Sequence, residues 1–161
     1  PEAKLKRQAY RLHLPKEAKA FIYGDFNQLS QVVSNLVNNA IKYTHEGGEI
    51  DISLRLEGGD DAEGDAQGRM VFEVRDTGYG ISPEAQAKLF TEFYRVRTQE
   101  TANIHGTGLG LSLVKSVMDA HDGDVGVNSE EGKGSTFYVA MALHDDQDSP
   151  ADFNQYWGAM G

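Results

Sequence analysis

The sequence predicts an α+β domain, a two-layer sandwich in which a mixed, mostly antiparallel sheet is covered on one face by about three helices. Segments with apolar residues at every third or fourth position, typical of helices, are interleaved with segments that alternate apolar and polar residues, typical of strands. Most strand-like segments come in consecutive pairs, which favours antiparallel hairpins. A length of 161 residues is that of one domain.

Each element has its own signal in the chain. The expected strands are residues 8–14, 20–23, 50–56, 70–75, 124–129 and 135–143. The expected helices are residues 26–43, Ser82 to about Phe90, and 109–121. Asp25 and Ser82 are of the type that caps helix N-termini, and the apolar stripe of the first helix is the clearest periodicity present. We therefore expect one domain over residues 1–144, with a long loop at 91–108, and a tail of unknown role at 145–161.

Composition and charge exclude several functions. The formal net charge of −10 argues against a general nucleic-acid or anionic-membrane surface. The absence of cysteine excludes disulfides, thiolate metal sites and cysteine nucleophiles. The N-terminal residues do not resemble a signal peptide, and the chain starts with Pro1, not Met, so we expect a fragment of a longer protein.

The first motif is a strip of amides on the helix at 26–43. On a helical wheel, Asn35, Asn39 and Lys42 fall within about 60° of one another, flanked by Gln31 and Asn38. A solvated helix face is the ordinary interpretation of such a strip. However, asparagine is a mediocre helix former, whereas its amide oxygen is a hard, neutral ligand that can join phosphate and water oxygens around Mg²⁺.

Three further motifs are weak when taken singly. Asp76-Thr-Gly78-Tyr-Gly80-Ile81 follows an expected strand, and its carboxylate can accept a hydrogen bond from an exocyclic amine. Gly106-Thr-Gly108-Leu-Gly110-Leu111 opens the third helix, where free N–H groups form an anion site. Phe90 to Arg95 combines aromatic residues, which are more often core than site, with a cation suited to phosphate.

Taken together and in this order, the motifs resemble those of the ATP-binding catalytic domain of sensor histidine kinases. That family belongs to a superfamily, of the Bergerat fold, shared with DNA gyrase, the ninety-kilodalton heat-shock chaperones and the mismatch-repair ATPases. The N box is matched by residues 35–43, the G1 box by 76–80, the F box by 90–95 and the G2 box by 106–111. The resemblance covers about residues 5–143, and four ordered motifs are far more specific than one.

The resemblance implies a site for ATP and Mg²⁺. It makes Asn39 the metal ligand, Asp76 the acceptor for the adenine amine, and residues 91–108 a lid over the nucleotide. Asn35, Lys42 and Arg95 would act on the transferred phosphate. The residues it assigns to the nucleotide are Asn35, Asn39, Lys42, Tyr43, Asp76, Gly78, Gly80, Ile81, Gly106, Thr107, Gly108, Leu109, Gly110, Leu111 and Thr136.

The resemblance also implies partners. The acceptor histidine of the family lies on a separate dimerisation hairpin, and none of the five histidines of this chain has that context. We therefore expect a cytoplasmic domain of a homodimer that works with that hairpin and a response regulator, and that contacts neither nucleic acid nor membrane directly.

Two other functions remain open at this point. One is a serine kinase of the anti-sigma type from the same superfamily, which usually lacks a motif like Phe90 to Arg95. The other is a nucleotide-binding regulatory module without catalysis. Position 35 narrows the chemistry, because ATP-hydrolysing relatives carry a glutamate there as general base, and Asn35 cannot take a proton from water.

Overall fold

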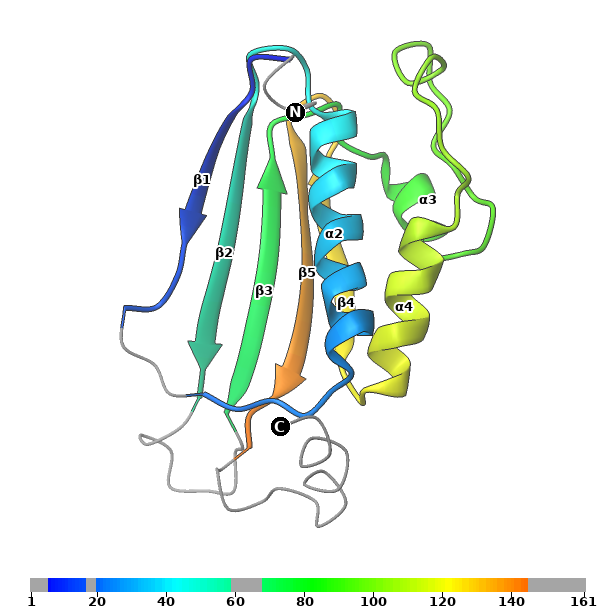
Figure 1. The fold of residues 1–161 in the computed structure, drawn as a ribbon. Helices are drawn as coiled ribbons and strands as arrows, with labels where there is room; N and C mark the ends of the chain where they lie inside the picture. The colour runs from blue at the N-terminus through cyan, green and yellow to red at the C-terminus, as the bar shows by residue number, and fades with distance from the viewer. Residues whose placement is uncertain (1–5, 17–19, 59–67, 145–161) are drawn as a thin grey trace.

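Five strands form one sheet with the spatial order β1-β2-β3-β5-β4 (Figure 1). The computed structural model describes residues 6–16, 20–58 and 68–144. The strands are β1 (Ala9–His13), β2 (Glu49–Glu57), β3 (Arg69–Asp76), β4 (Asp124–Glu130) and β5 (Gly134–Ala142). β1 pairs in parallel with β2, and the other neighbours are antiparallel. The prediction of a mixed, mostly antiparallel sheet is confirmed.

In the described ranges the chain forms three helices, and they lie on one face of this sheet (Figure 1), as the sequence predicts. They are α2 (Phe26–Tyr43), α3 (Pro83–Gln86) and α4 (Gly110–Ala120). The carboxylate of Asp25 accepts the N–H of Gln28 at 2.9 Å, so the predicted N-cap of α2 is formed. The cap satisfies one of the backbone donors that an α-helix leaves free at its start.

The core lies between α2, α4 and the inner face of the sheet. Val32, Leu36 and Ala40, spaced at three or four positions, turn one stripe of α2 inward and bury it. α4 contributes Val114, Val117 and Met118, and alternate residues of the strands complete the cluster. Because this stripe fixes the rotation of α2, the polar strip on its side is fixed as well.

The opposite face of the sheet and the edge strand β1 are open to solvent. Exposed ion pairs cross the outer face, among them Arg55 with Glu73, and such pairs contribute little to stability. On β1, the side chains of Tyr10 and Leu12 are 70% and 61% exposed. Among the described helices none covers β1 (Figure 1), which leaves these apolar side chains uncovered.

Two predicted elements differ from the structure. Residues 20–23 form no regular strand, and Phe21 makes a single antiparallel bridge with His144. The helix predicted from Ser82 to Phe90 is α-helical only to Gln86. Beyond it, hydrogen bonds to the third preceding residue, such as Leu89 N–H to Gln86, tighten the chain into turns. The predicted tail at 145–161 lies outside the described residues.

Candidate functional site

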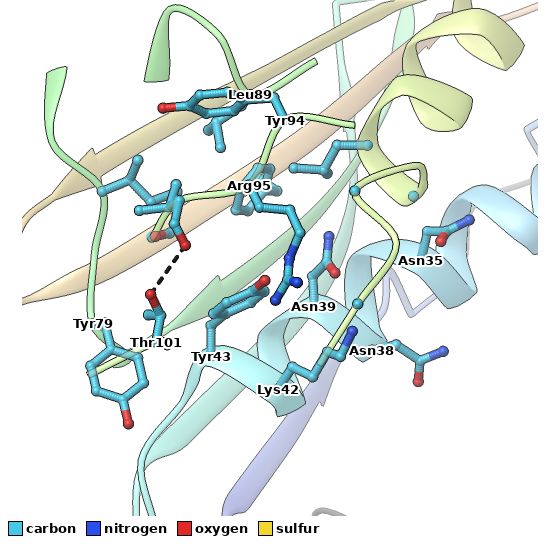
Figure 2. Close-up of a pocket in the computed structure, with 18 of the residues that line it drawn as sticks. Asn35, Asn38, Asn39, Lys42, Tyr43, Tyr79, Leu89, Tyr94, Arg95 and Thr101 are labelled. Atoms are coloured by element: carbon cyan, nitrogen blue, oxygen red, sulfur yellow. Dashed lines mark hydrogen bonds between the residues drawn. The ribbon is translucent and has the colours of Figure 1, made fainter. Parts of the chain in front are cut away.

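A cavity of about 270 Å³ opens between α2, the end of β3 and residues 94–111. Asn35, Asn39 and Lys42 of the polar strip line one side of it, together with Asn38 (Figure 2). They face the cavity because the apolar stripe of α2 occupies the side toward the sheet. Asn35, Asn39 and Lys42 are half-buried at the wall of the cavity, whereas Asn38 is exposed at its rim.

Asp76 is the last residue of β3 and lies at one end of this cavity. It is buried, with 6% of its surface exposed. Burial raises the pKa of its carboxyl group, while hydrogen bonds from the backbone of Gly78 and Ser135 and the charge of His45 act in the opposite direction. The Gly78 N–H is 2.8 Å from Oδ1. A buried carboxylate with a fixed orientation is suited to accept a hydrogen bond from a ligand.

The glycines after Asp76 allow two backbone segments to approach closely. A Cβ at Gly78 would collide with the carbonyl of Tyr43, the last residue of α2. Gly80 has φ +66°, and a Cβ there would collide with the carbonyl of Glu130. The N–H of Tyr79 also donates to the Tyr43 carbonyl at 3.2 Å. The loop after β3 is therefore locked between the end of α2 and the β4–β5 turn.

Two cations converge on the glycine-rich segment that precedes α4. Lys42 Nζ and Arg95 Nε lie 3.0 and 3.9 Å from the point where a Cβ on Gly106 would stand. Arg95 donates to the carbonyl of Ile104, and its buried Nε has no hydrogen-bond partner among the described residues. Although the whole chain is strongly acidic, this corner of the cavity is positive and matches an anionic ligand.

The N-terminus of α4 lies beside the same cations. Gly108 and Gly110 line the cavity, and the N-cap residue Leu109 makes no side-chain capping bond. The first N–H groups of α4 lack intrahelical partners and form an anion site of the kind that binds phosphate. A Cβ on Gly110 would stand 2.8 Å from Asn35 Oδ1, so the glycine lets α4 approach the amide strip of α2.

Residues 91–109 cover the cavity without forming a helix or strand. The segment is held by a few specific bonds: the N–H of Phe93 donates to Gly108, and the hydroxyls of Thr98 and Thr101 each accept the other residue's N–H. Thr101 is 4% exposed and lines the cavity, and its hydroxyl also donates to the Val96 carbonyl. Residues of this segment line the cavity, and its role as a lid stays a prediction.

The structure brings most of the predicted residues together. Those that line the cavity are Asn35, Asn39, Lys42, Tyr43, Asp76, Gly80, Ile81, Arg95, Gly106, Thr107, Gly108, Gly110 and Leu111. Two other predicted residues lie next to the cavity without lining it. The Gly78 N–H donates to the Asp76 carboxylate, and the Leu109 side chain is partly exposed to solvent.

The placement of Thr136 in the pocket wall is corrected. Side chains alternate along a strand, and its neighbours Ser135 and Phe137 line the cavity instead. Thr136 is paired with Arg75 of β3, whose side chain is exposed.

Eight further lining residues are not among the site residues that the sequence predicts. They are Asn38, Tyr79, Leu89, Tyr94, Val96, Thr101, Ser135 and Phe137. Tyr79 could have been found, because it stands between two glycines of the second motif. The alternation along β5 required the pairing of Asp76 with Ser135, which only the structure gives. Thr101 carries no signal in the sequence.

The fold and the site together define a class of protein, a two-layer sandwich with an enclosed anion site next to a buried carboxylate. A family model described as histidine kinase-, DNA gyrase B- and HSP90-like ATPase matches residues 24–145. The chain belongs to this family, and its fold is that of the ATP-binding domain of histidine kinases.

Similar proteins agree with this assignment. The chain is 36% identical over 125 residues to the sensor histidine kinase RppB of Synechocystis sp. (78% of this chain, 26% of RppB). It is 34% identical over 128 residues to the sensor histidine kinase WalK of Bacillus subtilis (80% of this chain, 20% of WalK). It thus spans about a quarter or less of the length of these relatives.

Solved structures give the same result. The full-length ShkA structure in complex with AMPPNP matches with a TM-score of 0.68 and 30% identity, covering 89% of this chain and 27% of that chain. The mycobacterial sensor histidine kinase MprB matches with a TM-score of 0.67 and 22% identity, covering 88% and 87% of the two chains, which shows a shared fold.

Proposed function

We propose that this chain is the ATP-binding catalytic domain of a two-component sensor histidine kinase. It would present Mg-ATP so that the γ-phosphoryl group is transferred to a histidine on a separate dimerisation hairpin, from which a response regulator receives the signal. The observation that carries the proposal is the convergence of the amide strip, Asp76 and the glycines before α4 on one cavity.

The residues present fit a magnesium ion held mainly by phosphate and water oxygens. Mg²⁺ in nucleotide sites usually keeps several waters and takes one or two protein ligands. No group of three or more His, Cys, Asp or Glu residues that could hold a metal by itself occurs in the described part of the chain. Asn39 would supply an amide oxygen, and its neighbour Asn35, whose Nδ2 donates to the Gln31 carbonyl, keeps Oδ1 toward α4.

The chain's own residues would act by positioning and by neutralising charge, which is the main requirement of phosphoryl transfer. Lys42, Arg95 and the N-terminus of α4 would hold the phosphates, while Asp76 would orient the base.

One of the chain's histidines, His121, has a structural role. Its Nε2 accepts the Asp25 N–H at 3.0 Å, and its Nδ1 is 2.7 Å from the Val117 carbonyl.

The remaining implied properties are part of the same proposal. The domain would be cytoplasmic and belong to a homodimer, with the hairpin domain and the response regulator as its partners. Separately, none of the helices in the described ranges is long and apolar enough to cross a membrane.

Calorimetric titration with ATP, with and without Mg²⁺, tests the proposal. We expect ATP to bind, Mg²⁺ to increase the affinity, and purified protein to release no more phosphate from ATP than a buffer control, because position 35 lacks an acid. Absence of ATP binding would overturn the proposal. Steady hydrolysis at the rate of the ATPase relatives would overturn the kinase assignment, and binding without transfer to a supplied hairpin domain would favour the regulatory module.

A further inference from the structure

Tyr79 lies at the end of the cavity that is remote from Asn35 (Figure 2). Its neighbours along the chain, Gly80 and Ile81, line the cavity, as does Asp76 three residues earlier. This end contains the carboxylate, whereas the Lys42 and Arg95 cations gather at Gly106. Tyr79 thus lies at the carboxylate end of the cavity, near the proposed place of a base and not near that of a phosphate.

The backbone of Tyr79 is held from two sides. Its N–H donates to the Tyr43 carbonyl at 3.2 Å, and its carbonyl accepts the Gly132 N–H at 2.7 Å. The flanking residues Gly78 and Gly80 are packed so closely that neither has space for a Cβ. The ring of Tyr79 therefore projects from a fixed point and can move only by rotation of its side chain.

His45 restricts that remaining freedom. It follows directly on the C-cap of α2, and its ring meets the Tyr79 ring edge to face, with centroids 4.3 Å apart and an interplanar angle of 79°. Edge-to-face pairs at this separation stabilise a defined ring orientation. The carbonyl of His45 is in turn bonded to the Gly48 N–H at 3.1 Å, so the brace is itself anchored.

We infer that Tyr79 is an affinity-determining wall for the nucleotide base and that His45 is the residue that positions it. The inference rests on the proposed function and deepens it. A planar base that enters beside Asp76 meets the Tyr79 ring, and contact between a base and an aromatic ring is largely independent of the phosphates. The wall therefore acts equally on ADP and ATP, whereas Lys42 and Arg95 favour the longer phosphate chain.

Calorimetric titration of ADP and ATP into the native chain and four variants tests this assignment. Tyr79→Leu should weaken both nucleotides by the same factor, about 5- to 30-fold, and Tyr79→Phe should stay within about twofold of the native chain. His45→Ala should weaken both by about 2- to 5-fold, and His45→Phe, which restores an aromatic edge, should recover most of that loss. Competition by inorganic triphosphate, which has no base, should not change in Tyr79→Leu.

These titrations distinguish a wall for the base from a general disturbance of the cavity. Unchanged ADP and ATP affinity in Tyr79→Leu, or a loss confined to ATP, would overturn the inference. Equal weakening of ATP and inorganic triphosphate would show a disturbed phosphate end and would overturn it as well. If the native chain bound neither nucleotide, the proposed function itself would be refuted. If the native chain and the Tyr79→Leu variant bound both nucleotides equally well, only the inference about Tyr79 would be refuted.

Discussion

The two ends of the cavity are built differently. At the end that contains Asp76, the proposed base end, α2, β3 and the β4–β5 turn meet through backbone contacts, and glycines at 78 and 80 remove the side chains that would separate them. At the other end, residues 91–109 have no regular structure and depend on a few side-chain hydrogen bonds, such as those between Thr98 and Thr101.

This difference separates two tasks. Segments joined by many buried backbone contacts unfold only when the whole domain unfolds. Segments held by few bonds unfold locally, and the free energy of that local opening is small. We therefore expect the base end to set recognition and to unfold with the domain. Residues 91–109, the proposed lid, should adjust to the phosphates without affecting global stability.

The largest expected effect is that of Gly80→Ala. Gly80 has φ +66°, and a Cβ there would collide with the Glu130 carbonyl, so the free energy of unfolding should fall by about 3 kcal/mol or more. Gly47→Ala is the matched control, since Gly47 has φ +75° but open space around it, and should cost about 1 kcal/mol. Chemical denaturation measures both, and equal losses would show that the close approach at the base end is unimportant.

Asn39→Ala tests the amide strip and should mainly affect binding. Loss of a metal-ligating amide should weaken Mg-ATP by about 10- to 100-fold, by analogy with the loss of groups around other metal sites, and should weaken metal-free ATP much less. Ser34→Ala, an exposed change on the same helix, is the control. An Asn39→Ala variant with native Mg-ATP affinity would refute the metal role of this residue.

Asp76→Asn should separate stability from binding. Because burial raises the pKa of the Asp76 carboxyl, the folded chain holds its proton more tightly than the unfolded chain, and stability is lost as pH rises through the interval between the two pKa values. At pH 7 the variant should thus be more stable than the native chain, and this advantage should shrink when both are measured at pH 3, because the carboxyl of the native chain is protonated more fully there.

The same Asp76→Asn variant should bind ATP poorly. The side-chain N–H₂ group of an amide is a hydrogen-bond donor, so it cannot accept a hydrogen bond from the purine amine. Denaturation curves at the two pH values, together with an ATP titration, check both parts. A variant less stable than the native chain at pH 7 would contradict the conclusion that the buried, charged carboxylate of Asp76 lowers the free energy of unfolding.

The smallest effect is expected in the lid. Thr101→Val removes the hydroxyl that accepts the Thr98 N–H and donates to Val96 while keeping the side-chain volume. The global free energy of unfolding should change by less than about 1 kcal/mol, whereas amide hydrogen exchange over residues 96–104 should become faster. A cooperative loss of several kcal/mol would show that the lid is part of the rigid fold and would remove the contrast between the two ends.

The sequence by itself determined most of the helices and strands and the class of site, although not the end of α3 or the absence of a strand at 20–23. The stripe of Val32, Leu36 and Ala40 predicts α2 and its rotation, so the amides on the adjoining face could be named in advance. The motifs at 76–81 and 106–111 could be found for the same reason, since glycine requirements and helix starts are local properties of the chain.

Only the tertiary structure decided which side chains share the cavity. Strand pairing places Ser135 opposite Asp76, which turns Ser135 and Phe137 inward and leaves Thr136 out of the pocket. The contact of His45 with Tyr79 joins residues far apart in the chain that share no periodicity, and the burial of Thr101 follows no local pattern. Register and long-range packing depend on many distant residues at once, so no local pattern encodes them.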